Sequence, residues 1–426
     1  MRARRCLIAT AMAVLLGVVW WLGGYWAFVF YVAAAALGLA WVMTYPVPGR
    51  LVVERNCSHR EAEIGDQVRV RARIRNAGLL PVAWVMAEDV VAPALPASGA
   101  RGELTWLLPG AEILLDYRVW CSRRGYFRIG PVLLETGDYF GLLRRFMARP
   151  PVAYLTVYPR LVPVGRMLVP TSRPVGEVRV ARAVVEDPGR PAGVREYRRG
   201  DPLHRIHWKV TAHTGRLHSR VYEFTQLQGA NLILDFHRDA WPAGGQAGAD
   251  LSELAVTTAA SIAAHLRERQ QLFGLITNGL DQARLIEAWP TELDVPSREK
   301  AAEILARREP PGRFEPVIVP PGKGKETLDL VLGVLARLGP GTGLTLAELI
   351  RREHPKWSRE LAAVLIVPAL GEEIVRAVGT LRAARFCVTV IVVARGGLGA
   401  EVARLHAAGI RVGLVGDWEE VMRLVV

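Results

Sequence analysis

Residues 67–76 read QVRVRARIRN, in which apolar side chains and arginines alternate without a break. This pattern places four apolar side chains on one face and four arginines on the other, as in a half-buried antiparallel strand. We therefore predict an all-β sandwich over residues 49–165, whose arginine-rich face is solvated or rests against anionic lipid headgroups. Further short strands, separated by turns that contain glycine or proline, are predicted at 82–91, 103–108, 113–121, 126–134 and 154–158.

The chain before this domain carries no charged side chain over residues 6–45. A helix of that length would be about 60 Å long, roughly twice the hydrocarbon core of a bilayer. Gly23-Gly24 lies near the middle, among aromatic residues that favour the headgroup interface. We predict a transmembrane helical hairpin within residues 1–48, with one span near 6–22 and a second near 26–45.

A signal peptide is the alternative, with Arg2, Arg4 and Arg5 as its basic region. Its apolar core, however, should extend over only about 7 to 15 residues. Arg50 and Arg55 follow the second predicted span, so both ends of the hairpin are basic. By the positive-inside rule we expect a multi-pass membrane protein whose soluble domains are cytoplasmic.

After residue 229 apolar strands alternate with stretches of helical period. Strands are predicted at 230–236 and 272–277, with a helix around 251–266 between them. Such alternation builds a mostly parallel sheet with helices on both faces. We predict a doubly wound α/β domain over 230–426. Its further elements are expected at 297–309 and 325–338 (helices), 363–367 (strand), from 372 (helix), 387–394 (strand), 399–408 (helix), 410–415 (strand) and 417–425 (helix).

The 426 residues are 51% hydrophobic and 22% charged, which allows two or three domains with cores and excludes a disordered chain. The four cysteines (Cys6, Cys57, Cys121 and Cys387) lie far apart without CxxC spacing. Neither a zinc site nor a disulfide framework is indicated, and a reducing compartment fits.

The formal net charge is +13, from 54 Lys and Arg against 41 Asp and Glu. Residues 179–220 alone hold ten Lys or Arg and four Asp or Glu, a net charge of +6. Aromatic and aliphatic side chains are interleaved with these charges. We therefore predict that this segment, within residues 166–229 between the two domains, folds against the adjoining domain and shows its basic side outward.

The motifs of this segment resemble a known bacterial family, called domain of unknown function fifty-eight. Upstream, a stretch resembles the family pattern RRG…GP…DPFGL, with Tyr139 in place of the usual proline. The residues that carry the resemblance are Arg195-Glu196-Tyr197, Gly200-Asp201, Arg205-Ile206-His207-Trp208-Lys209, Thr211-Ala212, Gly215-Arg216-Leu217 and Glu223, and upstream Arg123-Arg124-Gly125-Tyr126, Gly130-Pro131 and Asp138-Tyr139-Phe140-Gly141-Leu142.

The resemblance implies a protein of the bacterial inner membrane whose C-terminal α/β domain is von Willebrand factor A-like. Members are commonly encoded beside MoxR-type AAA+ ATPases and transglutaminase-like membrane proteins. It therefore implies a non-catalytic interaction protein that works with such an ATPase in the assembly or maturation of protein complexes. The residues that we predict to bind the partner are Tyr197, Arg198, Arg199, Asp201, Arg205, His207, Trp208, Lys209 and Arg216.

Two other function classes stay open. Residues 179–220 could bind nucleic acid or another polyanion, with Tyr197 or Trp208 stacking on bases, although acids in the segment and membrane anchoring weigh against it. A metal-dependent hydrolase could use the histidines beside Asp201, but their spacing matches no ligand signature. The simpler role for His207 is a hydrogen bond that orders the Trp208 loop. The histidines in question are His204, His207, His213 and His218.

A von Willebrand A domain with a working metal site carries Asp-x-Ser-x-Ser after its first strand, because Mg²⁺ prefers oxygen ligands. Here Asp235 is followed by His237 and Asp239 in place of the two serines, and residues 366–370 hold no aspartate. We predict a vestigial site in which Asp235 caps a loop. An ion bound by these three side chains would be a transition metal. No GxSxG, HExxH or Walker A motif occurs, so neither catalysis nor a cofactor is indicated.

Overall fold

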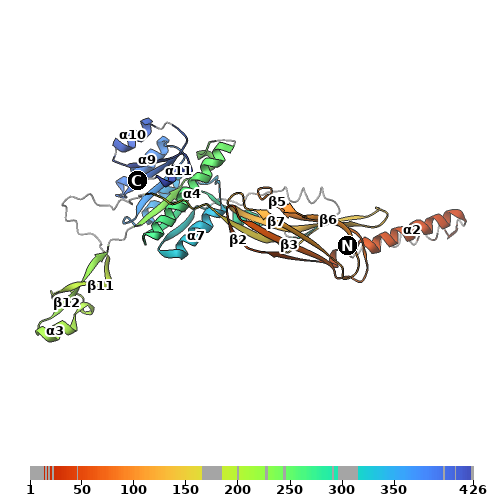
Figure 1. Cartoon of the computed structure of the whole chain (residues 1–426), viewed down its shortest axis with the longest axis horizontal. Coiled ribbons are helices and arrows are strands. Elements are labelled where there is room, and N and C mark those ends of the chain that lie inside the picture. The colour runs from red at the N-terminus through yellow and green to blue at the C-terminus, as the bar shows by residue number, and fades with distance from the viewer. Residues whose placement is uncertain are drawn as a thin grey trace. The chain divides into compact units, whose positions relative to one another are not determined.

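The computed structural model folds into two compact units, whose elements are labelled in Figure 1. Unit 1 comprises Met1–Tyr158 and Gln282–Pro311, and unit 2 comprises Pro159–Asp281 and Gly312–Val426. The structure describes residues 14, 17, 20, 21, 24–45, 47–165, 185–198, 201–225, 229–242, 246–289, 292–295, 315–396, 399–407 and 409–423.

Among the described residues, one helix is long and apolar enough to cross a membrane. This helix, α2 (Tyr25–Thr44), has 20 residues and no charged side chain, and its length of about 30 Å matches the hydrocarbon core. It corresponds to the second predicted span. The first predicted span, Gly23 and the basic residues Arg2, Arg4 and Arg5 lie outside the described part of the chain, apart from residues 14, 17, 20 and 21.

Unit 1 is strand-rich, as predicted, and contains two sheets. In β3 every second residue is buried, which is the alternation that QVRVRARIRN indicates. The first sheet has the order β1 (Leu51–Cys57), β3 (Gln67–Asn76), β7 (Glu112–Trp120) and β5 (Ala97–Gly99). The second has the order β16 (Leu293–Val295), β9 (Arg144–Arg149), β8 (Gly125–Gly137), β10 (Ala153–Tyr158) and β2 (Glu61–Glu63), with β4 (Val82–Val91) on β8 and β6 (Gly102–Leu107) on β4.

The two sheets of unit 1 share their buried side chains. One cluster joins Ile74 of β3 and Leu115 of β7 to Val85 of β4 and Leu134 of β8. A second cluster joins the other halves of β3 and β7 to β8 and β10. Burial of these apolar side chains between the sheets stabilises unit 1.

An ion pair is buried inside unit 1. The Arg55 and Asp89 side chains are 1% and 0% exposed and contact each other, and the Tyr117 hydroxyl donates a 2.7 Å hydrogen bond to Asp89. The Arg55 guanidinium also donates to the carbonyl of Ile129, at 3.0 Å. A Cβ atom at Gly130, whose φ is +91°, would collide with this guanidinium. Arg55, which the sequence analysis counts only among the basic residues after the second predicted span, is therefore a core residue of unit 1.

A late segment of the chain belongs to unit 1. Helix α5 (Gln282–Glu287) begins this segment, and β16 pairs antiparallel with β9 at the edge of the second sheet. The Tyr126 hydroxyl donates a 2.7 Å hydrogen bond to Glu287, and Arg149 forms an ion pair with Glu292. Residues far apart in the sequence thus complete one sheet.

Unit 2 contains a six-stranded sheet with helices on both faces, as the alternation of strands and helices predicts. All its neighbouring pairs are parallel except β17 with β14. Leu232 faces one side of the sheet and Ile233 the other, so both faces are apolar. The order is β17 (Val317–Gly322), β14 (Leu272–Thr277), β13 (Gly229–Leu234), β19 (Ala362–Val367), β20 (Val388–Val393) and β21 (Arg411–Val415).

The helices divide between the two faces of this sheet. The predicted helix at 297–309 lies outside the described residues. One face carries α4 (Gln246–Glu268), α7 (Gly324–Arg337) and α11 (Trp418–Met422). The other carries α8 (Leu346–Glu353), α9 (Glu372–Ala383) and α10 (Gly399–Ala407).

The basic segment forms a small sheet of its own, which we call the arm (residues 185–198 and 201–225). β11 (Val185–Glu196) and β12 (His218–Thr225) pair antiparallel with each other. Between them lie the short helices η2 (Leu203–Arg205) and α3 (Trp208–Thr214). Arg199, one of the predicted partner-binding residues, lies outside the described residues.

Candidate functional site

The connection from β11 to η2 is held by Asp201. Its carboxylate accepts the Arg198 backbone N–H at 3.0 Å and the Arg195 guanidinium at 2.8 Å. The Arg198 N–H and then Arg195 hold the pKa of Asp201 below its usual range. A second ion pair, Glu196 with Arg216 at 3.4 Å, is exposed. Asp201 thus orders the turn, and two of the arm's arginines pair with acids inside the arm.

His207 fixes the start of helix α3. Its Nδ1 accepts the backbone N–H of Val210 at 3.3 Å, which is the hydrogen bond of an N-cap residue. Gly215, at φ +72°, ends the helix in the left-handed conformation. The His218 ring lies 2.8 Å from the Arg216 carbonyl oxygen and 3.2 Å from the Thr214 hydroxyl. His207 therefore has the ordering role that the sequence predicts for it.

The arm exposes several large apolar side chains. Trp208 is 66% exposed and Leu203 is 71% exposed, and Leu217 is also exposed. Among arm residues whose side chains are described, only Ile206 and Ser219 are buried. A surface of this kind fits a partner-binding patch better than an independent core.

The structure places the described members of the predicted partner-binding set, which exclude Arg199, on this one small element. Arg198, Lys209 and Arg216 are exposed, as is Trp208. The others are half-buried: Tyr197, Asp201, Arg205 and His207. His204 and His213 are exposed. Within the described residues, no three His, Cys, Asp or Glu side chains are grouped so as to hold a metal ion.

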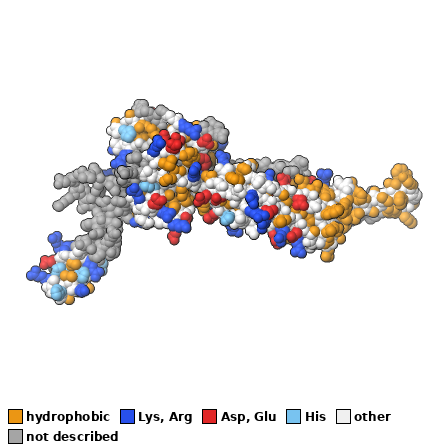
Figure 2. All heavy atoms as spheres, in the orientation of Figure 1, with side chains coloured by type: hydrophobic (Ala, Val, Ile, Leu, Met, Phe, Trp, Pro, Cys, Tyr) orange, Lys and Arg blue, Asp and Glu red, His pale blue; other side chains and the backbone are white. Residues whose placement is uncertain are grey.

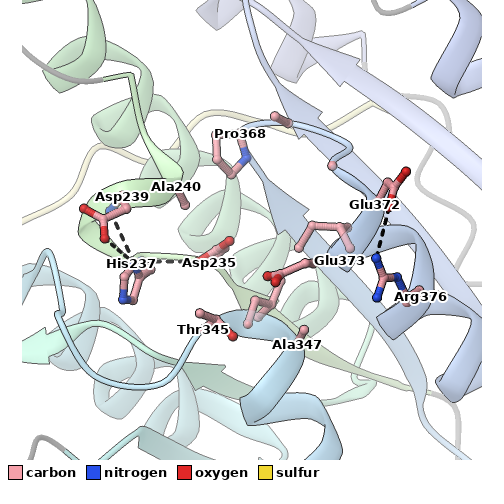
Figure 3. Close-up of a pocket in the computed structure, with 14 residues that line it drawn as sticks. Asp235, His237, Asp239, Ala240, Thr345, Ala347, Pro368, Glu372, Glu373 and Arg376 are labelled. Carbon is pink, nitrogen blue, oxygen red and sulfur yellow. Dashed lines mark hydrogen bonds and ion pairs between the residues drawn. The ribbon is translucent and has the colours of Figure 1, made fainter.

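A separate pocket of about 470 Å³ lies in unit 2, shown in Figure 3. It is at the carboxyl ends of the neighbouring parallel strands β13 and β19. The chain leaves β13 toward β14 on one side and β19 toward β20 on the other, so this is the switch point where doubly wound sheets bind ligands. Its lining includes Asp235, His237, Asp239, Thr345, Glu372, Glu373 and Arg376.

Asp235 holds the loop that follows β13 in place through hydrogen bonds. Its Oδ1 accepts the Asn278 side-chain amide at 2.9 Å and the backbone N–H of His237 at 3.2 Å. Burial raises the pKa of Asp235 above its usual value, although these donors and His237 oppose the shift. The His237 Nδ1 in turn accepts the Asp239 N–H at 3.3 Å. The carboxylate and the imidazole are therefore both engaged in holding the backbone.

We expect Asp235→Asn to stabilise unit 2 at neutral pH. Because the native pKa is raised, the native state binds the proton more tightly than the unfolded state, whose pKa is near 3.8. Native stability therefore falls as pH rises from about 3.8 through the raised pKa, and ionised Asp235 is unfavourable above it. Asparagine keeps the acceptor oxygen without the charge.

Thermal unfolding at several pH values measures this effect. The advantage of the Asp235→Asn variant should be largest near pH 7 and should vanish toward pH 4. Asp239→Asn is the control, because the Asp239 side chain is 88% exposed and should not respond. A variant less stable than the parent at neutral pH would show that the Asp235 charge is needed.

Part of the pocket was not predicted from the sequence. Thr345 caps α8 in a capping box with Glu348, a Thr-x-x-Glu signal that is readable in the sequence. Glu372 pairs with Arg376 at 3.0 Å on the first turns of α9. Their approach to Asp235 depends on the neighbouring positions of β13 and β19, which no local pattern encodes.

Comparisons with known proteins give limited likeness. No curated protein matches the chain. The structure of Escherichia coli alpha-2-macroglobulin from domain MG7 to the C-terminus is 14% identical over 29% of this chain and 20% of that chain, with a TM-score of 0.22. The chain thus spans about a fifth of that relative.

The FixG-related protein from Vibrio parahaemolyticus is 7% identical over 25% of this chain and 96% of that chain, with a TM-score of 0.19. A family match covers most of the arm and part of the chain after it. Residues 193–310 match the family described as protein of unknown function DUF58, which is the family that the signature residues of the arm resemble.

Proposed function

We propose that this chain is a membrane-anchored, non-catalytic docking protein, and that its arm binds a MoxR-type AAA+ ATPase. In this proposal the protein is multi-pass in the bacterial inner membrane, and its soluble units lie in the cytoplasm. It serves the assembly or maturation of other protein complexes, and a transglutaminase-like membrane protein is a further partner. The helix α2, which is apolar enough to span a bilayer, supports the anchoring.

One observation carries the docking proposal: Trp208 is 66% exposed, and only Ile206 and Ser219 are buried among the arm residues whose side chains are described. Binding energy at protein interfaces concentrates in Trp, Tyr and Arg residues. The exposed cations Arg198, Lys209 and Arg216 would speed the encounter with an acidic partner surface. Because His207 and Gly215 fix the ends of α3, Trp208 is presented by an ordered helix, which lowers the entropy that binding must overcome.

The α/β sheet supports a von Willebrand factor A-like assignment for unit 2. Counted along the chain, the strands of this sheet lie in the order 3-2-1-4-5-6, with helices on both faces. The residues at the switch point do not fit the Mg²⁺ site of such domains. His237 and Asp239 stand where serines would supply oxygens, and Asp235 is held by Asn278 and a backbone N–H. We derive no metal-dependent step.

Charge reversal on the arm tests the docking proposal. In the variant Arg198→Glu, Lys209→Glu and Arg216→Glu, the fold should be kept, because exposed charges usually change stability by no more than about 0.5 kcal/mol. Co-purification with the ATPase from native membranes should be lost, and a deletion strain should not be complemented.

The matched control reverses three exposed cations of unit 2 outside the arm, in the variant Lys323→Glu, Lys325→Glu and Arg359→Glu. It changes the net charge equally and should keep the ATPase. Full complementation by the arm variant would refute docking through the arm. Loss of a strongly salt-dependent binding to polyanions, with the ATPase retained, would favour the nucleic-acid or polyanion alternative.

A further inference from the structure

The end of unit 1 next to α2 carries a group of exposed apolar side chains. They lie on or beside the loops that join β3 to β4, β6 to β7 and β8 to β9. Figure 2 shows hydrophobic side chains gathered at this end of the strands. We call residues 77–81, 106–110 and 139–142 the loop surface. Its exposed members include Leu79 (93% exposed), Trp106, Leu108, Tyr139, Phe140 and Leu142.

The opposite end of the same strands is different. Residues 58–60, 64–66, 92–96 and 121–124 form the loops there, and Ile64 is the single large apolar side chain that they expose. All of these loops are within the described residues. Beside these loops, Trp120 at the end of β7 is 50% exposed. Large exposed apolar side chains are therefore more numerous at the end next to α2, and such patches mark interaction surfaces.

Helix α2 ends at the loop surface. Ala40 and Thr44 in its last turns are buried, and the helix contacts β4 and β8. Arg145 donates a 2.9 Å hydrogen bond to the Tyr45 carbonyl, and its guanidinium lies 5.2 Å from the centre of the Tyr45 ring. The foot of the helix is therefore fixed against the strands that lead into these loops.

The loops keep their own polar groups satisfied. The buried Asn76 side chain donates to the carbonyls of Leu80, at 3.0 Å, and Leu107, at 3.1 Å, and accepts the Gly78 N–H. The buried Asp138 accepts the Phe140 N–H in the third loop. Polar backbone groups that bond within the protein need no water, which is the condition for entry into lipid.

The distribution of charged residues also fits contact between the loop surface and a membrane. Residues 77–81, 106–110 and 139–142 contain no charged residue. The charged residues next to them in the strands are Arg50, Arg75, Arg144 and Arg145, together with Glu112, which lies opposite Arg75, and Glu135, which is 3.8 Å from Arg144. Apolar and aromatic side chains backed by arginines match the boundary between acyl chains and headgroup phosphates.

We infer that the loop surface inserts into the bilayer interface at the C-terminal end of α2, so that the sandwich is seated on the membrane. The ligand is the lipid itself, with acyl chains against the loop side chains and phosphates against the arginines. This inference rests on the proposed membrane anchoring. It assigns Leu79, Leu108 and Phe140 to lipid contact, independently of any protein partner of the arm.

Depth-sensitive fluorescence tests the inference in the full chain, reconstituted into phosphatidylglycerol and phosphatidylethanolamine vesicles. Leu79→Cys and Phe140→Cys, each in a Cys6→Ser chain, are labelled with an environment-sensitive dye. Ser122→Cys, an exposed position at the opposite end, is the matched control. The Cys6→Ser chain without an introduced cysteine gives the background from the remaining thiols.

The emission of the dye at residues 79 and 140 should shift to the blue. Its intensity should fall when the vesicles contain spin-labelled lipid, while the dye at residue 122 should show neither change.

Flotation of the vesicles measures membrane anchoring separately from the insertion of the loops. A chain that floats but shows no lipid quenching at residues 79 and 140 overturns the inference alone. A blue shift without quenching would mean that protein, such as a second copy of the chain, covers the loops. A chain that does not float would refute the membrane anchoring.

Discussion

Arg55→Ala is expected to destabilise the sandwich of unit 1 by about 3 to 5 kcal/mol, the usual cost of leaving a buried charge without its partner. Asp89 would remain in the core with the Tyr117 hydroxyl as its hydrogen-bond donor but without a cation. The Ile129 carbonyl would also lose its hydrogen bond from Arg55. Both losses act on strands that carry the core of unit 1.

Hydrogen exchange read by mass spectrometry locates the effect, because global unfolding of a chain with two units is not a two-state process. Protection should fall in β1, β4 and β7 and stay unchanged in the sheet of unit 2. Arg69→Ala is the control, since Arg69 binds Asp116 through two hydrogen bonds on the exposed face. Equal effects of the two variants would show that burial of the Arg55 pair is unimportant.

Trp208→Ala should have the largest effect on partner binding. An interface tryptophan of the hot-spot kind contributes at least about 2 kcal/mol, or roughly a 30-fold loss of affinity. Because the side chain is 66% exposed in the free arm, we expect little change in stability. A buried tryptophan would instead cost about 3 to 5 kcal/mol on truncation.

Affinity for the purified ATPase, measured with the detergent-solubilised full chain, checks this expectation. Trp418→Ala is the matched control, because Trp418 also begins a short helix and is 43% exposed. If Trp208→Ala lowers the melting temperature and leaves the affinity intact, the side chain supports the fold of the arm. The docking surface would then have to be sought elsewhere, for example at the pocket of unit 2.

Periodicity in the sequence predicted much of the regular structure. β3 and β14 have the predicted bounds, and α7 and β19 differ from them by one residue at most. Several missed strands carry little apolar period: β9 reads RRFMAR, and β2, β5 and β16 have three residues each. β1 and β17 were missed although they begin with the apolar residues LVV and VIV. Local patterns cannot identify a strand whose existence depends on pairing with an edge formed elsewhere.

The environments of the candidate site residues were predicted less completely than the strands and helices, because they also depend on contacts between distant segments. Composition and motif spacing located the arm, and the predicted hydrogen-bonded role of His207 is confirmed. The exposure of Trp208 is a property of the folded arm, since the same residue among apolar neighbours could equally have been a core residue. The burial of Arg55 was not predicted, because it depends on the position of Asp89 on β4.

The place of β16 on β9 has a consequence for how the protein is made. A ribosome releases residues 49–158 long before residues 293–295 leave the exit tunnel, so the nascent sandwich presents an unpaired β9 edge during this interval. Such edges invite pairing with other chains. A chain of residues 49–165 alone would keep the β9 edge unpaired, because it lacks β16. A shortened chain that extends to residue 295 would contain β16, which could then pair with β9.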